Sequence, residues 1–343
     1  MSDILLQVLN NEDIDWMVTT GVRRQLQPEE VLLLPEQVLA ELYLVLEGQL
    51  AMSAPCSQDE FAQVTRGDLL GGGWLFDALP ASVTTAKEPS TVLAIPKAQL
   101  SQKLANEVGF ASRFYRAIAL IMSERIRHQF ESVTDDTALL RYQSGQMVKE
   151  AVFVFGELHD SDIDWMMTTG KVDSIAADKV VLNMGRPVDA LYTVLDGQLA
   201  IATTNTPYDP FSGCSKRLEQ QAKNFTPLAF ISRGGLPGII SFLDFKPLPV
   251  RIHATKDSRM LTIPRREVVI KLQEDLSFAA RFYKVIATQT AQLLASVTAT
   301  ECKNAKSDAG MAMEEELNME ALQRASEGGQ KFDWMLKRLR VEA

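Results

Sequence analysis

Short apolar runs separated by turn residues dominate the first hundred positions of the chain. Each run is too short for a helix and is bounded by Gly, Pro or charged residues, which is the pattern of β-strands. Glu47–Gly48 stands between two of these runs and predicts a hairpin turn. Pro96 ends the last run, because proline cannot donate to a strand ladder. We expect strands at Val31–Leu34, Leu42–Leu46, Leu50–Met52, Val83–Ala86 and Thr91–Ile95.

Helical spacing replaces this pattern on both sides of the strands. A short helix is expected at Glu12–Thr20, with Asn11 as its N-cap and Gly21 at its C-terminal end. A long helix is expected at about 99–130. Its apolar stripe needs a partner, which is either the chain's own barrel or sister domain, or a second subunit. The stripe consists of Phe110, Phe114, Ala117, Ile118 and Ile121.

The whole pattern occurs twice in the chain. Asp13–Met17 returns as Asp162–Met166, at an offset of 149 residues (162 − 13), and the offset is the same for the surrounding segments. A constant offset indicates duplication of one domain-sized unit rather than short solenoid repeats. Phe110–Tyr115 returns as Phe278–Tyr283, at an offset of 168 residues (278 − 110). The second copy therefore carries about 19 extra residues (168 − 149), which we place in the polar loop Thr203–Asn224.

The second copy predicts the same elements as the first. We expect a helix at Ser161–Thr169 between Asp160 and Gly170, strands at Ile252–Thr255 and Met260–Ile263 before Pro264, and a long helix at about 266–298. A short helix, many short strands and a long helix together predict a β-barrel or jelly roll flanked by helices. We expect one domain at 1–131, a helical linker at 132–159, a second domain at 160–300 and a C-terminal tail at 301–343.

The repeated segment Leu42–Ala51 and its copy Leu191–Ala200 resemble the cyclic nucleotide-binding domain family. That family includes catabolite activator proteins and the regulatory subunits of cyclic-nucleotide-dependent kinases. The resemblance covers residues 11–130 and 160–298. It implies a mainly β fold with helices, built from two double-stranded β-helix (jelly-roll) domains that are each flanked by helices. The tandem arrangement is similar to that of bacterial proteins encoded beside bacteriocin-type export systems.

The resemblance also implies where a ligand would bind in the first copy. The family holds a cyclic nucleotide in a cassette with a Gly-Glu pair and, about nine residues after the Glu, an Arg. The Glu accepts from the ribose hydroxyl, and the Arg neutralises the phosphate. Gly71 matches the family Gly, but Gly72 stands at the Glu position and Ala81 at the Arg position. Gly71, Gly72 and Gly73 could cradle a phosphate through their amides, although a flexible turn is the simpler interpretation.

The second cassette departs from the family in the same way. Gly238 matches the family Gly, Ile239 stands at the Glu position and Val250 at the Arg position. Arg251 follows one residue later. Because a shift of one residue exchanges the two faces of a strand, Arg251 is expected to point away from the pocket. Gly238, Ile239 and Arg251 remain the candidate ligand residues of this cassette, and both cassettes otherwise serve the structure of the barrels.

Composition narrows the class of protein. The 343 residues have a net charge of −9 and are 46% hydrophobic, which favours packed domains and disfavours nucleic acid as a partner. No apolar run is long enough to cross a membrane, and the first residues lack the basic start of a signal peptide. The three cysteines, Cys56, Cys214 and Cys302, are scattered, so we expect a reduced, cytoplasmic protein.

Neither a catalytic centre nor a metal site is expected. His128, His159 and His253 are far apart and have no carboxylate or cysteine at ligand spacing. The sequence has no nucleophile elbow and no kinase signature. We therefore expect a protein that is not an enzyme and has no cofactor.

The tail ends in a candidate amphipathic helix at 331–341, preceded by a Gly328–Gly329 hinge. This helix could dock into a groove of a partner protein, or fold back on its own barrel. Binding to an anionic membrane is the weaker alternative, because the apolar stripe covers only about two turns. The candidate partner-binding residues are Phe332, Trp334, Met335, Leu336 and Leu339.

These features favour a non-catalytic scaffold or adaptor that acts through protein partners and inserts in no membrane. The alternative is a sensor of a nucleotide or another small molecule, with a modified pocket in the second domain, that regulates an export system. A DNA-binding regulator is rejected, because the 43 residues from Glu301 to Ala343 are too few for a winged helix-turn-helix and include an acidic run. Homo-oligomerisation is left open.

Overall fold

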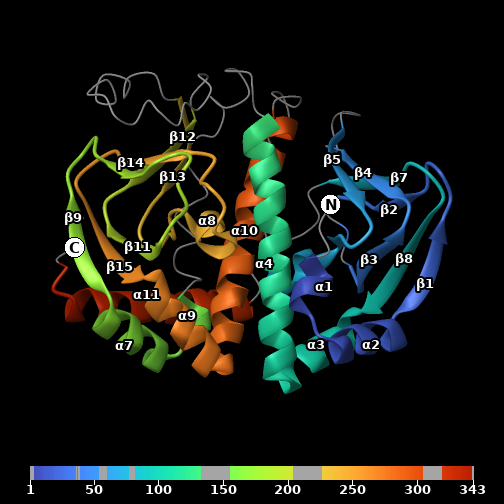
Figure 1. Ribbon diagram of the computed structural model, residues 1–343, viewed down its shortest axis with the longest axis horizontal. Coiled ribbons are helices and arrows are strands. Elements are labelled where there is room, and N and C mark those ends of the chain that lie inside the picture. The colour runs from blue at the N-terminus through green and yellow to red at the C-terminus, as the bar shows by residue number, and fades with distance from the viewer. Residues whose placement is uncertain are drawn as a thin grey trace. The chain divides into compact units, whose positions relative to one another are not determined.

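A computed structural model describes residues 4–35, 37, 39–53, 60–76, 82–132, 155–203, 226–303 and 319–341 (Figure 1). The strands form antiparallel ladders flanked by helices. The chain divides into two compact units, each made of two stretches. The first unit contains Met1–Ile126 and Ala279–Glu315, and the second contains Arg127–Phe278 and Glu316–Ala343.

Two four-stranded sheets form the centre of the first unit, in the orders β1-β8-β3-β6 and β2-β7-β4-β5. Its core is aliphatic and includes the Tyr43 ring. The elements are α1 (Ile4–Val8), α2 (Asn11–Thr20), β1 (Val22–Leu26), β2 (Val31–Leu33), β3 (Glu41–Glu47), β4 (Gln49–Ser53), β5 (Glu60–Thr65), β6 (Leu69–Leu70), the 3₁₀ turn η1 (Gly72–Phe76), β7 (Val83–Ala86), β8 (Ser90–Pro96), α3 (Lys97–Asn106) and α4 (Val108–Ser132).

The second unit has one three-stranded sheet, β11-β15-β9, and one four-stranded sheet, β10-β14-β12-β13. The part of α10 that begins at Ala279 belongs to the first unit. The elements are α7 (Asp160–Thr169), β9 (Lys171–Ile175), β10 (Val180–Leu182), β11 (Ala190–Asp196), β12 (Leu199–Thr203), β13 (Thr226–Ile231), α8 (Ile239–Asp244), β14 (Arg251–Ala254), β15 (Ser258–Pro264), α9 (Arg265–Glu274), α10 (Leu276–Lys303) and α11 (Met319–Arg338).

The turn at Glu47–Gly48 is confirmed, but the hairpin predicted from it is wrong. β3 pairs with β8 and β6, whereas β4 pairs with β5 and β7, so the turn carries the chain from one sheet to the other. Gly48 has φ +88°, and a Cβ there would lie 2.2 Å from Ser90 Oγ. Gly197 repeats this geometry against Ser258. The glycine is therefore required by a close approach as well as by its left-handed backbone.

The predicted strands are confirmed to within two residues at each end. The two long helices, in contrast, are each broken into two, at Glu107 and at Asp275. The Asp275 carboxylate accepts a hydrogen bond from the Phe278 amide at 2.9 Å and so starts α10 as a new helix. Side-chain capping by an aspartate competes with continuation of the preceding helix, which is why helical spacing alone missed the break.

The repeated Asp-Ile-Asp-Trp-Met segments start and anchor the short helices α2 and α7. The N-cap residues are Asn10 and His159, one position before those predicted. Asp13 accepts from the Asn10 amide at 3.1 Å, and Asp162 accepts from the His159 amide at 2.8 Å. The first Asp of each segment therefore fills the third helical position of a capping box, which fixed the helix start.

The tryptophan of each segment packs on the helix that follows the barrel. The Trp16 ring lies edge-on to Phe110 at 5.4 Å between centroids, and Trp165 lies edge-on to Phe278 at the same distance. In the first unit, the Arg113 guanidinium also donates two hydrogen bonds to the Asp13 carboxylate, at 2.6 and 2.8 Å. The two segments thus share helix capping and aromatic packing.

Replacing Asp13 should make the first unit less stable in a pH-dependent way. Burial of this carboxyl would raise its pKa, but hydrogen bonds from Arg113 and Asn10, with the Arg113 charge, outweigh it and hold the pKa below its ordinary value of 3.8. A lowered folded pKa stabilises the protein above the unfolded pKa, and this stability is lost as the pH falls through the folded pKa. Asp13→Asn should cost about 2 kcal/mol at pH 7 and progressively less below about pH 4. Urea denaturation at both pH values measures the difference, with the exposed Asp15→Asn as control. An equal cost at pH 7 and pH 3 would contradict this assignment.

Several expectations lie outside the described residues. They are the insertion loop from position 204, nearly all of the linker 132–159, Ala81, and the cysteines Cys56 and Cys214. Among the helices that the structure describes, none combines the length and the apolar character required to cross a membrane.

Candidate functional site

The second cassette begins with a glycine in a left-handed conformation. Gly238 has φ +76° and lies directly before α8. A Cβ at this position would lie 2.5 Å from Leu182 Cδ1 and 3.0 Å from Val188 Cγ2. The glycine that matches the family Gly is therefore required for packing as well as for its backbone conformation.

Substitution of Gly238 should show this requirement. Gly238→Ala adds left-handed strain of about 1–2 kcal/mol and a steric overlap with Leu182, so we expect a total loss of about 2–4 kcal/mol. Gly72→Ala is the matched control, because its Cβ would lie 3.2 Å from Leu42 Cδ1, at the flexible end of a side chain. Thermal unfolding of both variants measures the effect. Equal destabilisation by the two substitutions would show that the left-handed conformation is unimportant.

Apolar side chains occupy the two positions that the sequence comparison predicts for the charged ligand groups of the family. Ile239, at the predicted Glu position, is 8% exposed, and Val250, at the predicted Arg position, is 2% exposed. The neighbouring side chains of the cassette are also buried: Leu236, Ile240, Phe242 and Leu248. An anion placed among such groups would lose its hydration without gaining a charged partner, which is strongly unfavourable.

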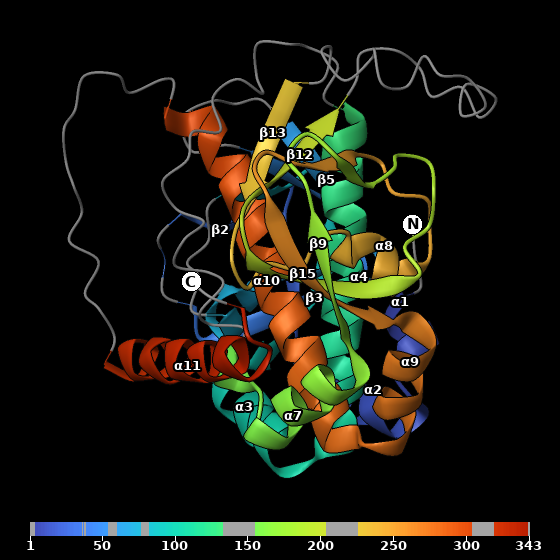
Figure 2. The same ribbon diagram turned by 90° about the vertical axis from the view of Figure 1, so that its left-hand side faces the viewer.

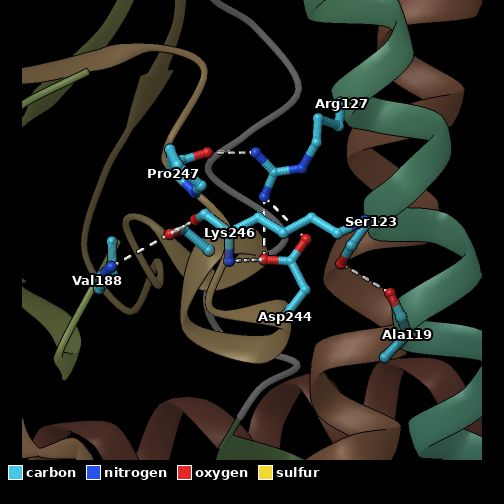
Figure 3. A network of polar contacts seen from close by, with 8 residues as sticks. Ala119, Ser123, Arg127, Val188, Asp244, Lys246 and Pro247 are labelled. Carbon is cyan, nitrogen blue, oxygen red and sulfur yellow. Dashed lines mark hydrogen bonds and ion pairs between the residues drawn. The ribbon is translucent and has the colours of Figure 1, made fainter. Parts of the chain in front are cut away.

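The polar groups of the cassette bond to one another (Figure 3). Ser241 Oγ accepts from the Val188 amide at 3.1 Å and donates to the Lys246 carbonyl. The Lys246 amide donates to Asp244 at 2.9 Å. Ser241 itself is fully buried. These groups are thus committed to holding the loop after α8 in place.

Arg127 secures the same loop. Its Nη2 donates to both carboxylate oxygens of Asp244, at 3.0 and 2.9 Å, and its Nη1 donates to the Pro247 carbonyl (Figure 3). Both side chains of the ion pair are 10% exposed. Sequence reasoning missed this pair, because its members are 117 positions apart and no motif joins them.

Arg251 lies on the outer face of its strand, as expected. It opens β14, in which Ile252 and Ala254 are 1% and 0% exposed. In the first unit, Ala86 pairs with Leu50 and both belong to the core; in the second, Ala254 pairs with Leu199 in the same way. Since side chains alternate along a strand, Arg251 points away from that interior.

Arg251 is nevertheless 8% exposed, and it shares its face with His253. Burial lowers the pKa of Arg251. Burial and then the Arg251 charge lower the pKa of His253 from its ordinary value of 6.5, and Asp178 opposes this. His253 is therefore neutral at pH 7, and the two side chains place one positive charge on the outer face of β14.

Strand register corrects the comparison of the two cassettes. Ala202 pairs with Arg251, and Ser53 pairs with Val83, so Val83 is the counterpart of Arg251. The sequence offset between these two counterparts is 168 (251 − 83). Gly67 and Gly234 are also counterparts, because their amides donate to the equivalent carbonyls of Val45 and Val194, and their offset is 167 (234 − 67). Of the 19 extra residues, 18 therefore precede Gly234 (167 − 149) and one lies in the cassette (168 − 167).

The first cassette carries no charged group at the Glu position. Gly71 has φ +75°, and a Cβ there would lie 3.1 Å from the Glu41 carbonyl and 3.2 Å from the Tyr43 ring. Gly72 and Gly73 form the start of η1, a 3₁₀ turn rather than the flexible turn expected. The Tyr43 hydroxyl donates to Glu41 at 2.8 Å, and burial and then Glu41 raise its pKa to about 12. Gly71, like Gly238, is therefore required for close packing.

The candidate docking residues of the tail lie in α11, except for Leu339, which directly follows it. α11 is longer than predicted and runs unbroken through Gly328 and Gly329. The predicted hinge is therefore wrong. Phe332, Met335 and Leu336 are buried at 8%, 0% and 4% exposure, whereas Trp334 and Leu339 are half-buried. α11 lies beside α7 of the same unit in both Figure 1 and Figure 2. The structure thus shows the alternative in which the tail folds back on its own unit.

The histidines do not meet at one place. His128 is exposed on α4, His159 caps α7, and His253 lies in β14. Across the described ranges, no group of three or more His, Cys, Asp or Glu side chains is arranged to hold a metal ion.

Comparison with known proteins finds one family model that matches a segment of the first unit. Residues 23–107 match the model of the cyclic nucleotide-binding domain family. The matched segment runs from β1 to α3 of the first unit and contains the first cassette. Such domains are typical of nucleotide-sensing and regulatory proteins, which are generally not enzymes. No curated protein matches the chain.

Solved structures of regulatory proteins are also similar. The regulatory domain of Toxoplasma gondii PKA with cAMP is 13% identical, with 79% of this chain and 92% of that chain covered and a TM-score of 0.27. A putative cyclic nucleotide-binding protein from Geobacter metallireducens is 19% identical, with 37% and 98% covered and a TM-score of 0.32. The N-terminal domain of a transcriptional regulator from Streptomyces coelicolor is 18% identical, with 41% and 88% covered and a TM-score of 0.32.

Proposed function

We propose that this chain is a non-catalytic regulatory adaptor that acts through protein contacts and no longer binds cyclic nucleotides in its cassettes. It consists of two jelly-roll domains of the cyclic nucleotide-binding type, at 1–131 and 160–300, and works in the cytoplasm. One observation carries this proposal: Ile239 and Val250 are buried apolar side chains at the positions where the family holds ribose and phosphate. A cyclic phosphate there would have no cation to neutralise it.

The loop after α8 in the second cassette is held by polar groups that bond within the second unit. Ser241, Asp244 and Lys246 are bonded to one another or to Arg127 and Val188. A ligand that entered this loop would have to break the network, and each buried polar group left without a partner costs about 1–3 kcal/mol. The bonding pattern is that of a fixed structural loop.

The second candidate is an anion sensor in the second unit, and the observation that favours it is the burial of Arg251. A guanidinium that is 8% exposed beside a neutral His253 is a suitable partner for an anionic group. The site would lie on the outer face of β14 and not in the family pocket. Loss of any measured anion binding in Arg251→Ala, with no loss in Arg259→Ala, would favour this candidate.

Thermal unfolding in the presence of nucleotide tests the proposal. A ligand at about 1 mM with a Kd of about 10 μM would stabilise the folded state by about 2.7 kcal/mol, which raises the Tm by several degrees. We expect neither cAMP nor cGMP to raise the Tm of the full chain by more than about 1 °C. A clear rise with either nucleotide would favour the sensor. Export systems of the bacteriocin type are the setting in which we would seek the protein partner.

A further inference from the structure

α11 covers an aromatic surface of the second unit. The Phe332 ring packs against Phe155, with 4.8 Å between the ring centroids. The Arg233 guanidinium lies 6.0 Å from the centroid of the same Phe332 ring. Phe155 is fully buried as a result. One aromatic side chain of α11 is thus held between an aromatic ring and a cation.

Two polar contacts fix the direction of α11 on this surface. Lys331 Nζ donates to the Leu158 carbonyl at 2.7 Å, and Arg338 lies 3.8 Å from the Asp164 carboxylate of α7. The lysine therefore contacts a backbone carbonyl just before α7, and the arginine contacts an exposed carboxylate within α7. The surface therefore accepts a helix with a basic group near each end.

The first unit carries similar residues at equivalent sequence positions, with an aliphatic Leu6 in place of the aromatic Phe155. The offset of 149 that relates the N-caps Asn10 and His159 also relates Leu6 to Phe155, Leu9 to Leu158 and Asp15 to Asp164. The offset of 167 that relates Gly67 to Gly234 relates Arg66 to Arg233. We call Leu6, Leu9, Asp15 and Arg66 the Leu6 surface.

Three residues of the Leu6 surface, Leu6, Asp15 and Arg66, are exposed, whereas Leu9 is buried like its counterpart Leu158. Leu6 is 58% exposed, whereas Phe155 is 0% exposed. Glu12, also exposed, stands where the second unit has Ser161, so the first surface is the more acidic of the two. An apolar, an acidic and a basic residue thus occupy the sequence positions equivalent to those that contact α11 in the second unit.

The number of α11-type helices, compared with the number of surfaces that could bind one, indicates which molecule would occupy the Leu6 surface. The described residues contain two such surfaces but one α11, and that helix is seated on its own second unit. A second copy could cover the Leu6 surface only by exposing its own Phe155. A helix supplied by another protein could cover the Leu6 surface without exposing Phe155 of any copy of this chain.

We propose that the Leu6 surface binds an amphipathic helix of a partner protein that carries the same groups as α11. In order, these are a lysine, an aromatic residue, apolar residues three and four positions after the aromatic, and an arginine six positions after it. In α11 they are Lys331, Phe332, Met335, Leu336 and Arg338. This inference rests on the proposed adaptor function and assigns that function a surface and a class of partner.

A labelled peptide of residues 326–341 tests the proposal on the full chain by fluorescence anisotropy. We expect saturable one-to-one binding, because the cis helix already covers the second unit. Leu6→Glu should weaken binding at least about tenfold, and Asp15→Lys by roughly threefold. Leu34→Glu is the matched control, since Leu34 is also exposed, at 53%, and belongs to the same unit. Its affinity should equal that of the wild type.

Three results would overturn the proposal. The first is no binding at about 1 mM peptide, since a docking site should bind more tightly than that. The second is binding that Leu6→Glu leaves unchanged, which would place the peptide on the second unit by exchange with α11. The third is self-association of the protein that Leu6→Glu abolishes, which would make a second copy the occupant. None of these involves a nucleotide, so each is distinguishable from a failure of the proposed function.

Discussion

Asp244→Ala should destabilise the second unit by about 3–5 kcal/mol, more than most single substitutions in this chain. The variant removes the carboxylate that binds Arg127 and leaves a guanidinium that is 10% exposed and still donates to the Pro247 carbonyl. An unpaired buried charge is far more costly than the ion pair is favourable. The Lys246 amide loses its acceptor at the same time. Urea denaturation followed by circular dichroism measures the loss.

Two further variants separate the ion pair from a general effect of losing an aspartate. Asp333→Ala removes an exposed carboxylate from the same unit and should change the stability by less than about 0.5 kcal/mol. Arg127→Met in the Asp244→Ala background should restore part of the stability, because it removes the unpaired charge. If Asp244→Ala lies within about 1 kcal/mol of the wild type, Arg127 does not secure the cassette loop.

Phe332→Ala should release α11 from the second unit. Truncation of a buried phenylalanine costs about 3–5 kcal/mol, and here it removes the ring that packs against Phe155 and Arg233. Gly328 and Gly329 lie inside the helix and each cost about 1 kcal/mol relative to alanine, so α11 depends on its docking. Amide hydrogen exchange within α11 should become at least a hundredfold faster, on the order of 3 kcal/mol.

The exposed Lys337→Ala is the matched control for this experiment, since it changes the same helix without touching the docked face. Its exchange rates should stay within about threefold of the wild type. Unchanged exchange in Phe332→Ala would mean that the Phe332 contact contributes little to the docking of α11. The proposal for the Leu6 surface, which is based on that contact, would then lose its support.

Local sequence signals predicted most elements but not their partners. Glu47–Gly48 marks a turn in any context, because its glycine needs a left-handed backbone. Whether the two strands beside it pair with each other depends on β6 and β8, which lie far along the chain. Asp275 did carry a local signal as a helix-capping residue, and helical spacing on both sides concealed it.

In the candidate site, too, local features could be predicted from the sequence but long-range contacts could not. Ile239 and Val250 are apolar in the sequence, so their burial could be anticipated, and period-two alternation correctly turned Arg251 away from the barrel interior. The contacts of Arg127 with Asp244 and of Phe332 with Phe155 join segments that are more than a hundred positions apart. No spacing rule reaches such pairs, because they arise only when the elements pack.

Isothermal titration of the full chain with cAMP and with cGMP tests the central claim most directly. The cassettes lack the charged groups that such ligands require, so we predict no saturable heat at micromolar concentrations of either nucleotide. A Kd below about 10 μM, which corresponds to a binding free energy of about −7 kcal/mol, would contradict the account. Loss of that heat in Arg251→Ala would then place the ligand at β14.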